Sequence, residues 1–135
     1  MFTAEEIMTK DVISVKRNTP IREAMELMLN HKISGLPVVD NDMNLVGVIS
    51  EKDVVTLLYD IDNLESQKVH NFMTERPICF DIDDGLVEIC DFFSKNLFRR
   101  VPITSEGKLV GIISVPDIIQ YTLNINKEKY KSPMS

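Results

Sequence analysis

Residues 45–53 read LVGVISEKD, and residues 109–117 read LVGIISVPD. The two stretches start 64 positions apart and share an apolar run, a glycine, a serine and an aspartate at identical spacing. The apolar run predicts a buried strand, and the serine predicts the start of a helix directly after it. A strand-to-helix stretch that recurs in this order indicates an internal repeat, and the repeat decides the fold.

The match between the two copies extends towards their N-terminal ends. Met8-Thr9 recurs as Met73-Thr74, at an offset of 65 residues. One residue is lost between the copies, where residues 40–44 face residues 105–108, and both segments have turn composition that tolerates a change of length. Further matches at the offset of 65 are Ile13 with Ile78, Glu23 with Glu88 and Pro37 with Pro102.

The first copy predicts a strand, a helix, a hairpin of two strands and a second helix. Residues 12–15 form a short β-type run, Pro20 opens a helix, and Gly35 ends the helical region. Residues 36–39 and 45–49 flank an Asp/Asn turn and predict the hairpin. The second helix is expected to start at Ser50 and to carry Val54, Val55, Leu57 and Leu58.

The second copy predicts the same order, with a strand at 78–80, a helix at 86–95, a hairpin of 101–103 with 109–113, and a helix from Ser114. The expected fold class is therefore α/β (α+β), built from two β-α-β-β-α repeats. A unit of this size is small for a core of its own, so the two should pack together. The expected boundaries are 1–62 for the first repeat, 63–70 for a linker, 71–123 for the second repeat and 124–135 for a frayed polar tail.

Composition narrows the class of protein. The 135 residues carry a formal net charge of −6, which argues against a general nucleic-acid binder, because phosphate-backbone affinity needs a basic surface. No apolar run is long enough to span a bilayer, the N-terminus does not read as a secretory signal, and the two cysteines form no disulfide framework. The spacing of histidines and cysteines indicates no metal site. We expect a cytoplasmic protein that does not contact the membrane.

The repeated Ser-x-x-Asp element supports two interpretations. One is a capping box, in which serine begins the helix and the acidic residue reaches back to its backbone. The other is a ligand site, because a helix N-terminus favours anions, a serine hydroxyl can bind phosphate, and an aspartate can accept two hydrogen bonds from a ribose diol. Both interpretations stay open at this point. No arrangement of residues typical of a catalytic centre is visible, so we expect no enzymatic activity.

These stretches together resemble the cystathionine β-synthase (CBS) domain family. The resemblance rests on Met-Thr in both copies, on GLPVVD at 35–40 and GVISEKD at 47–53, and on RVPI at 100–103 and GIISVPD at 111–117. It implies a stand-alone pair of repeats related by a pseudo-twofold axis, often called a Bateman module. Such modules bind adenosine nucleotides (AMP, ADP or ATP), or S-adenosylmethionine in some members, in clefts between the repeats. They commonly form homodimers and regulate another protein as energy-state sensors.

The resemblance also implies which residues line the clefts. Asp53 and Asp117 match the ribose-binding aspartates, and Ser50 and Ser114 match the residues that contact phosphate. Each cleft is completed by the segment leading into the other repeat. The cleft of Ser114 and Asp117 is expected to be closed by Thr9, Val12 and Ile13, and that of Ser50 and Asp53 by Thr74, Pro77 and Ile78. Residues before the strand proline are also expected to line the pockets: Ile33, Ser34, Phe98, Arg99 and Arg100.

The two clefts are not equivalent in sequence. The second copy has Arg99-Arg100 where the first has Ser34-Gly35, and arginine binds phosphate through two parallel hydrogen bonds. We therefore expect the Ser114 side to bind phosphorylated ligand more tightly, although Pro116 removes one backbone N–H there. The alternatives are an S-adenosylmethionine sensor and an interaction module with empty clefts. No cofactor is expected beyond the nucleotide ligand, and the regulated protein is not identified by the sequence.

Overall fold

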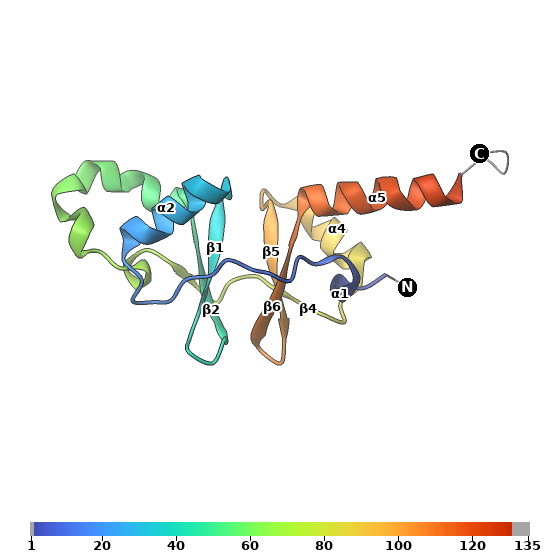
Figure 1. The fold of residues 1–135 in the computed structure, drawn as a ribbon, viewed down its shortest axis with the longest axis horizontal. Coiled ribbons are helices and arrows are strands. Elements are labelled where there is room, and N and C mark those ends of the chain that lie inside the picture. The colour runs from blue at the N-terminus through green and yellow to red at the C-terminus, as the bar shows by residue number, and fades with distance from the viewer. Residues whose placement is uncertain (1, 131–135) are drawn as a thin grey trace.

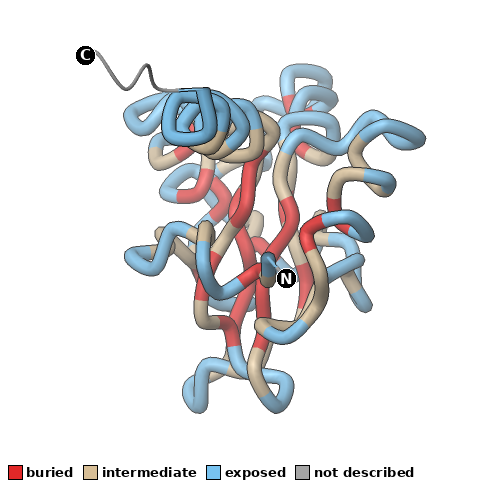
Figure 2. The backbone as a smooth tube through the Cα atoms, turned by 90° about the vertical axis from the view of Figure 1, so that its right-hand side faces the viewer, coloured by how far each residue is buried: buried red, intermediate tan, exposed pale blue. Residues whose placement is uncertain are grey.

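The computed structural model describes residues 2–130 of the chain. Two three-stranded sheets lie face to face in the centre, and the helices cover their outer sides (Figure 1). The buried segments concentrate in the strands and in the helix faces that rest on them (Figure 2). The expected α/β class with two packed repeats is confirmed.

The first sheet has the order β1-β2-β3, and the second has the order β4-β5-β6. Each is built around an antiparallel hairpin, β1 with β2 in the first repeat and β5 with β6 in the second. The strands are β1 (Gly35–Val39), β2 (Leu45–Ser50), β3 (Thr74–Glu75), β4 (Phe80–Asp81), β5 (Arg100–Ser105) and β6 (Lys108–Ser114).

Four α-helices lie where the sequence predicts helices, whereas the helices at Ala4–Ile7 and Val69–Asn71 were not predicted. The helices are α1 (Ala4–Ile7), α2 (Ile21–His31), α3 (Glu51–Val54), α4 (Leu86–Lys95) and α5 (Val115–Lys129), with 3-10 helices η1 (Val55–Ser66) and η2 (Val69–Asn71). Helices α2 and α4 are amphipathic, each with buried residues on one face.

The repeats exchange their leading segments. In the N-terminal segment, Thr9 pairs with Ile112 of β6 in the second repeat, and Val15 pairs with Val38 of β1 in the first. The chain therefore crosses from one repeat to the other, as the blue segment in Figure 1 shows. The segment after residue 71 makes the reverse crossing, because Thr74 pairs with Val48 of β2.

The pairings obey a pseudo-twofold relation throughout. Shifting the pair Thr9–Ile112 by the repeat offsets gives Thr74–Val48, and shifting Thr3–Gly85 gives Lys68–Pro20. Val15–Val38 likewise becomes Phe80–Ile103. The two copies found in the sequence therefore make equivalent backbone pairings. Each position in one repeat has an equivalent position in the other.

The two hairpin tips bond to each other and close one end of the pair. The backbone N–H of Leu45 donates to the Gly107 carbonyl at 3.0 Å, and that of Leu109 donates to the Met43 carbonyl at 2.9 Å. The Asp40 carboxylate holds the first tip by accepting from the Asn44 side chain and backbone, and these bonds lower the pKa of Asp40 below its ordinary value. The opposite end of the two hairpins holds Gly35, Ser50, Arg100 and Ser114.

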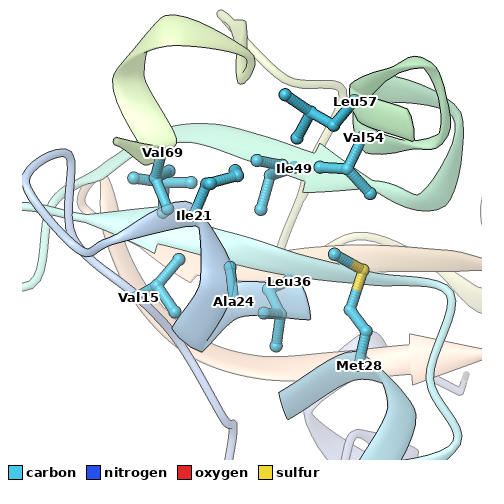
Figure 3. Packing of buried hydrophobic residues seen from close by; sticks show 10 residues of the cluster. Val15, Ile21, Ala24, Met28, Leu36, Ile49, Val54, Leu57 and Val69 are labelled. Atoms are coloured by element: carbon cyan, nitrogen blue, oxygen red, sulfur yellow. The ribbon is translucent and has the colours of Figure 1, made fainter. Parts of the chain in front are cut away.

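Each repeat has its own hydrophobic core under its helices. In the first, Ile21 and Ala24 of α2 and Ile49 of β2 are fully buried and pack with Val69 of η2 (Figure 3). In the second, Ile89 of α4 and the strand residues Val101, Ile103 and Ile113 form the corresponding cluster. Ala4 of α1 belongs to this second cluster, so the exchanged segments help to fill the cores of both halves.

Several local expectations were wrong. Residues 12–15 do not form a strand, because the segment turns between the two sheets and only Val15 pairs. The strand expected at 78–80 is β4, Phe80–Asp81. Gly35 belongs to β1, and Lys32 ends α2 instead, with a left-handed φ of 53°. Pro20 precedes the first helical residue of α2 as its N-cap.

The helix after Ser50 also differs. Only α3 is α-helical, and η1 follows with a break at Asp60. The Asn63 side chain donates to the Asp60 carboxylate at 2.7 Å, and the Ser66 hydroxyl donates to the Asn63 backbone carbonyl, a bond that competes with the backbone bonds of a regular helix.

Residues 124–129 of the expected polar tail belong to α5, whereas residues 131–135 lie outside the described residues. Half-buried Ile125 continues the inner face of α5 after Ile118 and Tyr121, which explains the longer helix. The expected linker, residues 63–70, holds the end of η1 and the buried Val69 of η2.

Candidate functional site

Both Ser-x-x-Asp elements form capping boxes. The backbone N–H of Ser114 donates to Asp117 Oδ2 at 2.9 Å, and the Asp117 N–H donates to Ser114 Oγ at 3.2 Å. In the first copy the Ser50 N–H and hydroxyl donate to Asp53 Oδ2 at 2.9 and 3.1 Å. The capping interpretation is therefore confirmed. It leaves room for a second role, because a carboxylate has two acceptor oxygens and the cap uses Oδ2 of each aspartate.

A cavity of about 280 Å³ opens beside Ser114 and Asp117. Its volume is close to the lower end of small-molecule pockets, roughly 300–1,000 Å³. The crossing segment of residues 9–13 forms one wall, and the start of the other repeat's β1 forms another. Its lining residues are Thr9, Asp11, Val12, Ile13, His31, Ile33, Gly35, Arg100, Ile112, Ser114 and Asp117.

The structure thus brings together six of the residues expected around Ser114, and places Ile33 of the first repeat with them. Arg100 is half-buried and lines the cavity. Arg99 and Phe98 do not line it. The Arg99 side chain is exposed, while its carbonyl accepts from Val115 at the start of α5, and the Phe98 ring packs on Phe92 at 5.4 Å.

The second expected set lies at the pseudo-symmetric position. Thr74 pairs with Val48, two residues before Ser50, just as Thr9 pairs with Ile112, two residues before Ser114. The backbone carbonyl of Ser34 accepts from the Glu51 N–H, as the backbone carbonyl of Arg99 accepts from the Val115 N–H. Pro77 is half-buried, and Ile78 is 49% exposed. The backbone pairings around Ser50 are therefore equivalent to those around Ser114, but Ser50 and Asp53 line neither the cavity beside Ser114 nor the apolar groove between α2, α3 and η1.

Four lining residues were missed at the sequence level: Asp11, His31, Gly35 and Ile112. Three had a signal, because Asp11 precedes Val12, Ile112 lies two strand positions before Ser114, and Gly35 matches Arg100 across the repeats. His31 had none, because its position depends on the end of α2 and the left-handed turn at Lys32.

Comparison with known proteins identifies this architecture. The family model of the CBS domain matches residues 4–60 and again residues 69–124. A protein of Methanocaldococcus jannaschii, the uncharacterised MJ1225, is 37% identical over 85% of this chain. The match spans 41% of the length of that protein.

Two solved structures share the whole fold. CBSX2 of Arabidopsis thaliana, crystallised in complex with AMP, is 30% identical, covers 93% of this chain and 99% of that one, and superposes with a TM-score of 0.83. The CBS domain pair of MJ0100, in complex with 5′-methylthioadenosine and S-adenosyl-L-methionine, is 25% identical over 93% of this chain and 98% of that one, with a TM-score of 0.77. Among residues 2–130, no helix is long and apolar enough to cross a bilayer.

Proposed function

The chain belongs to the CBS domain family as a tandem pair, and from this premise we propose that it is a regulatory module that binds an adenosine nucleotide, AMP, ADP or ATP, in the cavity beside Ser114 and Asp117. The two ligand-bound CBS pairs that share its fold hold AMP in one case and methylthioadenosine with S-adenosylmethionine in the other. The common part of these ligands is an adenosyl group.

One observation carries the proposal: a single cavity gathers the groups that each part of an adenosine nucleotide requires. Val12, Ile13 and Ile33 supply apolar surface for the faces of adenine. Asp117 offers a carboxylate oxygen outside the cap for the ribose diol. Ser114 and Arg100 supply donors for phosphate, which arginine binds with charge-assisted hydrogen bonds.

A thermal-shift panel tests this function. AMP, ADP, ATP, NAD and S-adenosylmethionine are each added in the millimolar range, and adenosine nucleotides are expected to raise the melting temperature. A ligand present at about 100 times its Kd stabilises the folded state by ~2.7 kcal/mol, which corresponds to several degrees in a domain of this size. A shift with S-adenosylmethionine alone would make the chain a sensor of that ligand. If no adenosyl compound shifted the melting temperature, the proposal would be refuted. The remaining interpretation would be an interaction module with empty clefts.

We further propose that the module acts as a homodimer, which would control an unidentified protein in trans. An apolar groove of about 420 Å³ runs between α2, α3 and η1. Apolar residues stand exposed at equivalent helix positions of both repeats, Val55 with Ile119 and Tyr59 with Leu123. Exposed apolar surface of this kind marks interaction sites.

Sedimentation at micromolar concentration tests the dimer. We expect a species of twice 15.4 kDa for the wild type and a shift to monomer for Leu58→Glu, since Leu58 lines the groove and is 74% exposed. The matched control is Leu97→Glu, at an exposed position that does not line the groove. A wild type that sediments only at 15.4 kDa would contradict the dimer.

A further inference from the structure

Four ionisable side chains line the cavity, and they come from four different elements. Asp11 lies on the crossing segment, His31 on the last turn of α2, Arg100 at the start of β5 and Asp117 on the first turn of α5. Two of these side chains are carboxylates, one is a guanidinium and one is an imidazole. The charge of this small space therefore depends strongly on each of them.

These side chains differ in whether hydrogen bonds or ion pairs within the protein already occupy them. Asp117 is held by the Ser114 cap. Within residues 2–130, neither His31 nor Arg100 takes part in an ion pair, and the ring of His31 forms no hydrogen bond. His31 belongs to the first repeat and Arg100 to the second, so two available donors approach the cavity from opposite halves of the molecule.

We propose that His31 sets the preference of this cleft for a phosphorylated over an unphosphorylated adenosyl ligand, an inference that rests on the proposed function. A phosphate monoester carries a charge of about −1.5 to −2 and three strong acceptor oxygens. The fork of one arginine binds two of those oxygens, and an imidazole N–H can bind the third. Asp11 acts against this preference, because its carboxylate repels the same phosphate.

The arrangement also explains how phosphate would affect the protein as a whole. A phosphate held by Arg100 alone would be bound within the second repeat. A phosphate that His31 also contacts joins α2 of the first repeat to β5 of the second. Phosphorylated ligand would then stabilise the packing of the two repeats, whereas adenosine would contact His31 less or not at all.

Calorimetric titration with AMP and adenosine tests this role. The quantity compared is the ratio of the two affinities, because it cancels effects on the adenosyl part. In His31→Gln the preference for AMP is expected to fall by about tenfold, the order expected for one hydrogen bond to a charged group. His31→Lys should keep or raise the preference, and Asp11→Asn should raise it without adding a positive charge.

His70→Gln is the matched control, since His70 is the other histidine of the chain, is exposed, and does not line the cavity. A ratio that stays the same in His31→Gln while adenosine still binds would overturn the role of His31 and leave the proposed function standing. Failure of both ligands to bind the wild type would instead refute the proposed function, and this inference with it.

Discussion

Asp117→Asn is expected to weaken the binding of adenosine and of AMP by the same factor, about 10- to 100-fold. The factor is common to both ligands because both carry the ribose diol, and losing hydrogen bonds to a charged acceptor costs ~1.5–3 kcal/mol. Asparagine retains one acceptor oxygen for the Ser114 N–H, so the helix cap is kept while the charged second oxygen is lost. Calorimetry with the two ligands measures the factor.

Two comparisons assign the effect to the ribose contact. Asp53→Asn makes the same change in the other capping box, and it should leave the tighter binding event nearly intact. With 2′-deoxyadenosine as ligand, the wild type should bind weakly and Asp117→Asn should cause little further loss, because coupled groups are not additive. If Asp53→Asn abolished the tight event and Asp117→Asn spared it, the cavity beside Ser114 would not be the main site.

The order of elements could be predicted because the repeat is visible twice. Met8-Thr9 lies over Gly111, and Met73-Thr74 lies over Gly47. The residues that match between the two copies therefore make equivalent contacts. Only the resemblance to CBS domains predicted that the segment leading into each repeat lies against the other repeat. The composition of a segment cannot show that its partner strand lies in the other repeat.

Local geometry that depends on single side chains could not be predicted. Residues 55–66 form η1 with non-helical backbone angles at Asp60, and α2 ends where Lys32 adopts a left-handed conformation. Arg99 and Arg100 read as an equivalent pair in sequence, yet Arg99 precedes β5 with its side chain exposed, and only Arg100, the first residue of β5, lines the cavity. His31 lines the cavity as the last residue of α2, and the sequence did not predict that this helix ends there.

Gly47→Ala is expected to be among the most damaging small substitutions in the chain. A Cβ at Gly47 would lie 2.7 Å from the backbone carbonyl oxygen of Thr74, so β3 would have to move away from β2. Overpacking of this kind costs ~1–3 kcal/mol, which exceeds the ~0.4–1 kcal/mol gained from a less flexible unfolded chain. Urea unfolding should therefore show a clear fall in midpoint. Gly85→Ala is the comparison without overpacking, because its nearest neighbour, the Phe2 carbonyl oxygen, lies at 3.9 Å, and any loss there comes from the N-cap position of α4.

Gly111→Ala separates stability from binding. At Gly111 the added Cβ would meet Met8, whose Sδ and Cγ can move by rotation, while its Cβ at 3.0 Å yields only with a small shift of the crossing segment. None of these atoms belongs to the backbone, so the fall in the urea midpoint should be smaller than for Gly47→Ala. Displacing Met8 moves its neighbour Thr9, however, and Thr9 and Ile112 both line the cavity. Gly111→Ala should therefore weaken AMP binding more than Gly47→Ala does. Equal losses of AMP affinity in the two variants would show that the crossing segments do not shape their clefts independently.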